Sequence, residues 1–149
     1  MVGFFSYYLV VRGYRILYLK KLGAGQTATW LDWSIVAIAV SFGGSLVIWS
    51  FLPGSKGFST VALAFGIICL GFSARDIQLF VTGPKQKNHW LFGHLTSMGA
   101  GYIATWTAFV VTNIHFLPTV VVWLAPTVIG TICIAYARRK YQSKTAHRC

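Results

Sequence analysis

A histidine and a methionine lie four residues apart at His94 and Met98, within a long apolar segment. On a helix this spacing places both side chains one turn apart, where they could bind copper or serve a haem. The spacing of three or four residues then continues the same stripe through further aromatic and polar residues. The continuation comprises Tyr102, Thr105, Phe109 and Asn113.

A haem iron held by two histidines would need a second histidine at the same depth in the membrane. His115 follows His94 by 21 residues, which is about 31 Å along a helix. His89 is expected in a loop. One copy of the chain therefore predicts no bound cofactor, and a haem or metal at His94 and Met98 remains an alternative that needs a ligand from a second copy or another protein.

A second group of candidate residues is ionisable, and all of its members fall in one half of the expected membrane-spanning segments. The group comprises Arg12, Arg15, Asp32, Arg75, Asp76 and His94. Charges inside a membrane are costly and are usually paired or functional. We therefore expect an ion-paired polar cluster that fixes helix ends, with Asp32 near a helix start. A ligand or proton site with Asp76 as the proton acceptor is the alternative, and His94 should hydrogen-bond to Asp76 or to a backbone carbonyl.

The sequence contains no motif that predicts catalysis. It has no glutamate, no HExxH, no P-loop, no CxxC pair and no Ser/His/Asp set. We therefore expect a structural or binding role rather than an enzyme. The alternative is a membrane redox protein, or a transporter of protons or small solutes, that uses His94, Met98 and Tyr102.

The composition indicates that lipid surrounds the elements that position these residues. Of the 149 residues, 56% are hydrophobic and only 10% are charged, and the mean hydropathy is +0.64, too little polar surface for a soluble domain of this size. The net charge of +11 lies in short segments beside apolar runs. Anionic lipid headgroups are therefore the expected partners of these charges, and nucleic acid is not.

Apolar runs predict an all-α, antiparallel transmembrane bundle of one domain, residues 1–149. Four clear spans are expected at about 31–52, 58–80, 90–117 and 119–136, since about 20 apolar residues cross a bilayer. A shorter span at 2–19 is interrupted by Arg12 and Arg15, which can snorkel to the headgroups. Residues 137–149 form a basic tail, and the loops are short enough to make neighbouring helices antiparallel.

The basic residues predict the orientation of the chain. Twelve of the 13 fall on alternate connections and the tail, and only Lys56 lies on the other side. The positive-inside rule then places the C-terminus in the cytoplasm and the N-terminus outside, in a cell inner membrane. Small residues at helix-packing spacing, such as Ala39 with Gly43 and Ser97 with Gly101, indicate close helix contacts and a homo-oligomer or larger membrane complex.

Several segments resemble an uncharacterised family of bacterial multi-pass inner-membrane proteins. The similar residues are Gly13-Tyr14-Arg15, Leu31-Asp32-Trp33, the run from His94 through Met98 and Tyr102 to Phe109, Asn113, and Trp123-Leu124-Ala125-Pro126-Thr127. The resemblance implies an inner-membrane location and no particular activity. Longer members of the family carry additional N-terminal helices with further histidines, so this chain is expected to be a shortened member that lacks the partners of His94.

Overall fold

The computed structural model describes residues 2–22, 25–52, 58–84, 88–114 and 116–146, with side chains as far as residue 141. The described residues form five helices, which confirms the predicted all-α class. In chain order the helices are α1 (Val2–Tyr18), α2 (Trp30–Ser50), α3 (Ser59–Thr82), α4 (His89–Asn113) and α5 (Thr119–Ala146).

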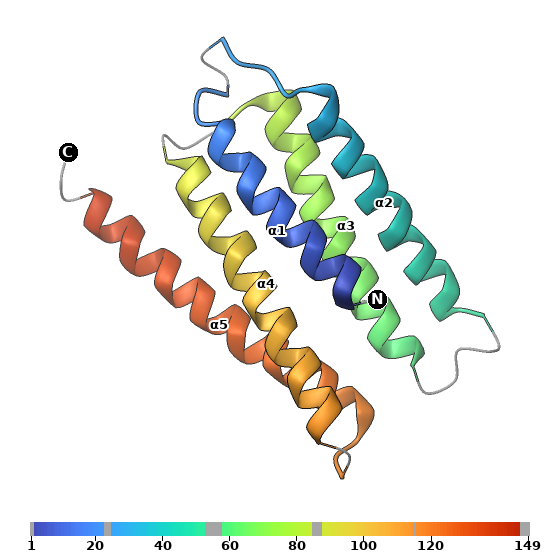
Figure 1. The fold of residues 1–149 in the computed structure, drawn as a ribbon. Coiled ribbons are helices and arrows are strands. Elements are labelled where there is room, and N and C mark those ends of the chain that lie inside the picture. The colour runs from blue at the N-terminus through green and yellow to red at the C-terminus, as the bar shows by residue number, and fades with distance from the viewer. Residues whose placement is uncertain (1, 23–24, 53–57, 85–87, 115, 147–149) are drawn as a thin grey trace.

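Consecutive helices run in opposite directions (Figure 1), as short connections require. Helices α2 and α3 pack together as one pair, and α4 and α5 as another. Helix α1 packs along α4 and lies across the space between the two pairs (Figure 1). The end at which α1, α3 and α5 finish and α2 and α4 begin is called the basic end, because five of the described arginines lie toward it. They are Arg12, Arg15, Arg75, Arg138 and Arg139.

Three of the described helices, α2, α3 and α5, are long and apolar enough to cross a membrane. The expectation of four clear spans and a short one is thus only partly met. Helix α4 has 25 residues, but many of them are glycine, serine, threonine or histidine, which lower its hydropathy. Helix α1 has 17 residues and includes two arginines.

Two expected boundaries differ from the structure. The span predicted at 90–117 ends as a helix at Asn113, because Ile114 adopts an extended conformation. The last helix does not stop at residue 136 but continues to Ala146, so most of the predicted tail is helical. Arginine, lysine, glutamine and alanine are good helix formers, and their presence at 137–146 extends the helix beyond its apolar run.

The core forms where α1 meets the other helices. Leu9 is fully buried, and the Phe5 ring meets Phe65 of α3 edge to face at 5.4 Å between centroids. Phe65 also meets Trp123 of α5 at 5.9 Å. Aromatic pairs of this geometry hold helices together in addition to their buried area, so α1 and α5 are joined through one ring of α3.

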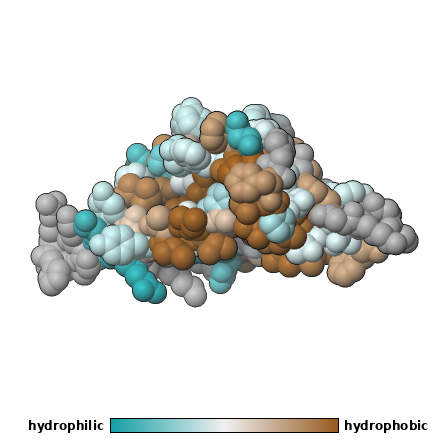
Figure 2. Space-filling view, turned by 90° about the horizontal axis from the view of Figure 1, so that it is seen from below, coloured by the Kyte–Doolittle hydropathy of each residue, from teal (hydrophilic) through white to brown (hydrophobic). Residues whose placement is uncertain are grey.

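Large apolar side chains are exposed on every helix, and wide areas of the surface in Figure 2 are apolar. Examples are Tyr7, Ile48, Ile67, Phe109 and Ile129. A soluble monomer rarely exposes apolar patches this broad. A surface of this kind suits contact with lipid.

Candidate functional site

Arg12 and Asp76 form a buried ion pair between α1 and α3. Arg12 Nε and Nη2 donate to the two carboxylate oxygens of Asp76 at 2.6 and 2.5 Å, and Nη1 donates to Ser97 Oγ of α4. The planar guanidinium matches the carboxylate with two parallel hydrogen bonds. One arginine thereby connects three helices.

Arg15, one turn further along α1, pairs with the other carboxylate. Its Nε and Nη2 donate to the two oxygens of Asp32 at 2.8 and 2.9 Å. Asp32 also accepts hydrogen bonds from the Thr29 backbone N–H at 2.9 Å and from the Thr29 hydroxyl at 2.7 Å. A carboxylate in the first turn that reaches back to the residue before the helix stabilises the helix start, so this pair fixes α1 to the beginning of α2.

The two pairs differ in how much solvent reaches them. Both carboxylates are buried, with Asp76 at 7% and Asp32 at 2% exposed, but Arg12 is 10% exposed and Arg15 is 25% exposed. Interactions between charges are screened less as the surroundings become drier. The Arg12–Asp76 pair is thus the one on which the interior of the bundle depends most.

The structure brings four of the six predicted cluster residues into these two pairs and leaves Arg75 and His94 outside them. His94 Nδ1 donates to the Gly13 carbonyl oxygen at 2.8 Å, the second of its two expected kinds of partner. At Gly13, α1 lies close to α4. A Cβ at that position would lie 3.0 Å from Ser97 and Met98.

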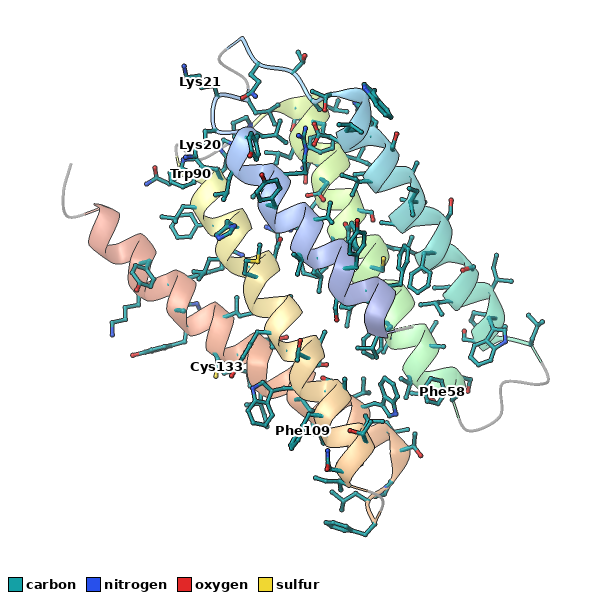
Figure 3. The ribbon with its side chains drawn as sticks, viewed as in Figure 1. Lys20, Lys21, Phe58, Trp90, Phe109 and Cys133 are labelled. Atoms are coloured by element: carbon teal, nitrogen blue, oxygen red, sulfur yellow. The ribbon has the colours of Figure 1, made fainter. Side chains whose placement is uncertain are left out.

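The stripe on α4 does not converge on one site. His94 and Met98 are half-buried against α1, whereas Tyr102, Thr105, Phe109 and Asn113 are exposed (Figure 3 labels Phe109). Each step of four residues advances about 40° around a helix. Tyr102 is therefore turned by about 80° from His94, away from α1. Among the described residues, no group of three or more His, Cys, Asp or Glu side chains is close enough to hold a metal ion.

A cavity of about 290 Å³ opens at the basic end between α1, α3, α4 and α5. Arg75 from the last third of α3 and Arg138 from α5 both line it, beside the Arg12–Asp76 pair. Arg138 is close enough to Arg75 for their positive charges to repel each other. We call this space the arginine cavity.

Neither Arg75 nor Arg138 forms an ion pair in the described part of the chain. The sequence has only two acidic side chains, and Arg12 and Arg15 engage both. The wall of the arginine cavity thus carries two cations with no side-chain carboxylate available to neutralise them.

Two nitrogens of residues that line this cavity are buried without a hydrogen-bond partner among the described residues. They are Arg138 Nε and His89 Nδ1. The other ring nitrogen of His89 donates to the Leu19 carbonyl at 3.0 Å. Of the two atoms, Arg138 Nε is a donor in every state of the side chain, so it can serve as a donor to an anion. Lys20 lies nearby at the same end, with Nζ 4.6 Å from the centroid of the Trp90 ring (Figure 3).

A second cavity of about 330 Å³ lies deeper, among α1, α3, α4 and α5. Its walls are formed mainly by aliphatic, aromatic and threonine side chains. Four residues line both this space and the arginine cavity: Phe72, Arg75, Thr96 and Arg138. The two cavities therefore adjoin, and we call the deeper one the apolar cavity.

No protein-family model, curated protein or solved structure matches the chain. The function must therefore be argued from the chemistry of the cavities.

Three residues of the site, Arg138, His89 and Ser97, are not among those predicted from the sequence. Arg138 falls in the predicted tail, because the last span is expected to end at residue 136, and His89 falls in a predicted loop. One signal is present in the composition: two acidic residues cannot neutralise 13 basic ones. It does not show which arginines are left without a partner.

Proposed function

We propose that this chain is a binding protein of a cell inner membrane in which α1 and α4 cross the bilayer together with α2, α3 and α5. The basic end then faces the cytoplasm and the N-terminus faces outside. The asymmetry of the basic residues supports this orientation. The contacts of α1 with α4 and with the aromatic core support a common depth for all five helices.

We further propose that the protein binds an anion in the arginine cavity. The observation that carries this proposal is how the charges are paired. Both carboxylates form ion pairs with arginines of α1, whereas Arg75 and Arg138 line one cavity. Arg75 is exposed and Arg138 is half-buried, and like charges that line one cavity repel each other. An anion between them would replace repulsion by attraction.

The chemistry of the donors indicates an oxyanion such as a phosphate or a carboxylate. Guanidinium groups bind these anions through pairs of hydrogen bonds. Arg138 Nε is buried and has no partner in the described structure. Asp76 remains occupied by Arg12 in this proposal, so it holds the wall of the cavity and leaves the positive charge of Arg75 and Arg138 to the ligand.

The experiment measures thermal stability of the purified protein in a neutral detergent as inorganic phosphate is added at constant ionic strength, with chloride as the balancing salt. A ligand at about ten times its dissociation constant stabilises the folded state by about 1.4 kcal/mol. Wild type should gain stability with phosphate, and Arg75→Gln and Arg138→Gln should gain much less.

Arg139→Gln is the matched control, because Arg139 neighbours Arg138, is exposed and does not line the cavity. It should respond to phosphate as wild type does. The proposal is wrong if phosphate has no effect on wild type, or if all three variants lose the effect equally, since the latter would indicate general screening of positive charge.

A further inference from the structure

We propose that the anion is the headgroup of an anionic membrane lipid, one acyl chain of which occupies the apolar cavity. This inference rests on the anion site proposed above and names its ligand class. It follows from how the two cavities adjoin, from the chemistry of their walls and from the sparse packing of α3 against α5.

The arginines stand at the boundary between the two cavities. Arg75 and Arg138 line both spaces, and Arg138 lies over the Phe92 ring at 6.0 Å. A phosphate held by these guanidinium groups would have a polar space on one side and an apolar space on the other. Phospholipids have this order of groups, whereas a free phosphate leaves the apolar side empty.

Three of the four threonines that line the apolar cavity turn their hydroxyl groups away from it; the fourth is Thr127. Thr96, Thr107 and Thr131 each donate the side-chain hydroxyl to a carbonyl one turn earlier in the same helix, at 2.7, 2.9 and 2.6 Å. With the hydroxyl turned to its own backbone, each threonine leaves its methyl group for packing. The remaining wall is largely Phe, Ile and Ala, so a hydrocarbon chain meets few unsatisfied polar groups.

The apolar cavity has room for part of an acyl chain. An apolar cavity of about 150 Å³ in a protein interior is large enough to hold one benzene molecule, which has about six carbon atoms. At about 330 Å³, this cavity has room for roughly a dozen carbon atoms on the same scale. That length is a large part of a membrane acyl chain.

The chain can enter from the bilayer between α3 and α5. Each of these helices packs extensively against its own partner, α2 or α4, but α3 and α5 touch each other only sparsely. Both line the apolar cavity, and both are apolar enough to lie in the membrane. A lipid of the leaflet at the basic end could therefore slide its chain between them while its headgroup reaches the arginines.

The test compares four ligands on protein stripped of lipid in neutral detergent: a phosphatidylglycerol, a phosphatidylcholine with the same chains, glycerol phosphate and inorganic phosphate. Native mass spectrometry counts the bound lipids, and thermal stability reports all four ligands. Phosphatidylglycerol should bind at least about tenfold more tightly than glycerol phosphate, since burying about two methylene groups already accounts for such a factor. Phosphatidylcholine should bind more weakly than phosphatidylglycerol.

Two alanines of α5 provide a matched pair of variants. Ala135 lines the apolar cavity and is exposed, whereas Ala137 lines neither cavity. Ala135→Phe should fill the chain site and lower phosphatidylglycerol affinity about tenfold while leaving the response to inorganic phosphate intact. Ala137→Phe should change neither, and Arg75→Gln with Arg138→Gln should lose both.

The outcomes separate this inference from the anion site. If phosphate binds but phosphatidylglycerol binds no better than glycerol phosphate, or Ala135→Phe has no effect on the lipid, the anion site stands and the lipid inference is wrong. Equal binding of the two lipids would also overturn it. If neither phosphate nor any lipid stabilises the protein, the anion site itself is wrong.

Discussion

The substitution Asp76→Asn would leave Arg12 charged in the interior of the bundle without a counter-ion. Arg12 makes two hydrogen bonds to the carboxylate and a third to Ser97, and both side chains of the pair are at most 10% exposed. Removing one partner of a buried pair costs about 3–5 kcal/mol. We expect the lower part of this range, since the amide oxygen of asparagine can still accept one bond from Arg12.

The loss should appear as a lower unfolding temperature. For a chain of this size each kcal/mol shifts the midpoint by about 2–4 °C, so a cost of about 3 kcal/mol predicts a fall of roughly 6–12 °C. Cys69 provides the assay, because it is fully buried whereas Cys133 is exposed. In a protein with Cys133 and Cys149 replaced by serine, labelling of Cys69 by a thiol-reactive dye during heating reports when the core opens.

Two further variants decide whether the unpaired charge is the cause. Arg12→Met combined with Asp76→Leu removes both charges and should recover most of the lost stability, as apolar replacements of buried pairs often do. Asp32→Asn should cost less than Asp76→Asn, because Arg15 is 25% exposed and water can solvate it. The reasoning is refuted if Asp76→Asn unfolds at the same temperature as wild type, or if the double variant is as unstable as Asp76→Asn.

Three other predictions concern packing, charge and orientation. Gly66→Ala should destabilise the protein by about 1–3 kcal/mol in the same labelling assay, since a Cβ there would lie 2.9 Å from the Gly43 carbonyl oxygen of α2. Gly71→Ala should be neutral or stabilising, because a Cβ at that position meets no atom within 4 Å. Equal losses of stability in the two variants would contradict close packing of α2 on α3. Asp76→Asn, measured at a temperature where it is folded, should bind phosphate more tightly than wild type, because Arg12 then adds its positive charge to the cavity. Weaker binding would contradict this reasoning and show that Asp76 supports the anion site. A fluorescent protein fused to the C-terminus should fluoresce in cells and a periplasmic reporter at the same place should be inactive; the reverse pattern would overturn the proposed orientation.

The approximate positions of the helices were predictable from the apolar runs, and the helix ends were less so. Residues 137–146 continue α5 through polar helix formers that carry no apolar signal. The pairing of charges was predictable only as a group. Which arginine meets which aspartate depends on the rotation of α1 relative to α2 and α3, and no local pattern encodes that rotation. Met98 and Tyr102 also could not be placed from the sequence. A spacing of four residues turns by about 40° per step around a helix, so helix packing decides at which residue the stripe becomes exposed.

The depth of Arg75 is the strongest reason to separate it from the arginines that merely orient a membrane protein. Orienting residues sit in loops and flanks, where headgroups and water solvate them. Arg75 precedes the end of α3 at Thr82 by seven residues, about 10 Å along the helix. Arg138 lies nearer the end of its helix, three residues before Tyr141 and next to Arg139 and Lys140, and it lines the same cavity from there. An arginine held below the headgroups needs a counter-charge there. If α3 crosses the bilayer as we propose, a lipid phosphate drawn in between α3 and α5 would supply it, since α1 takes both carboxylates.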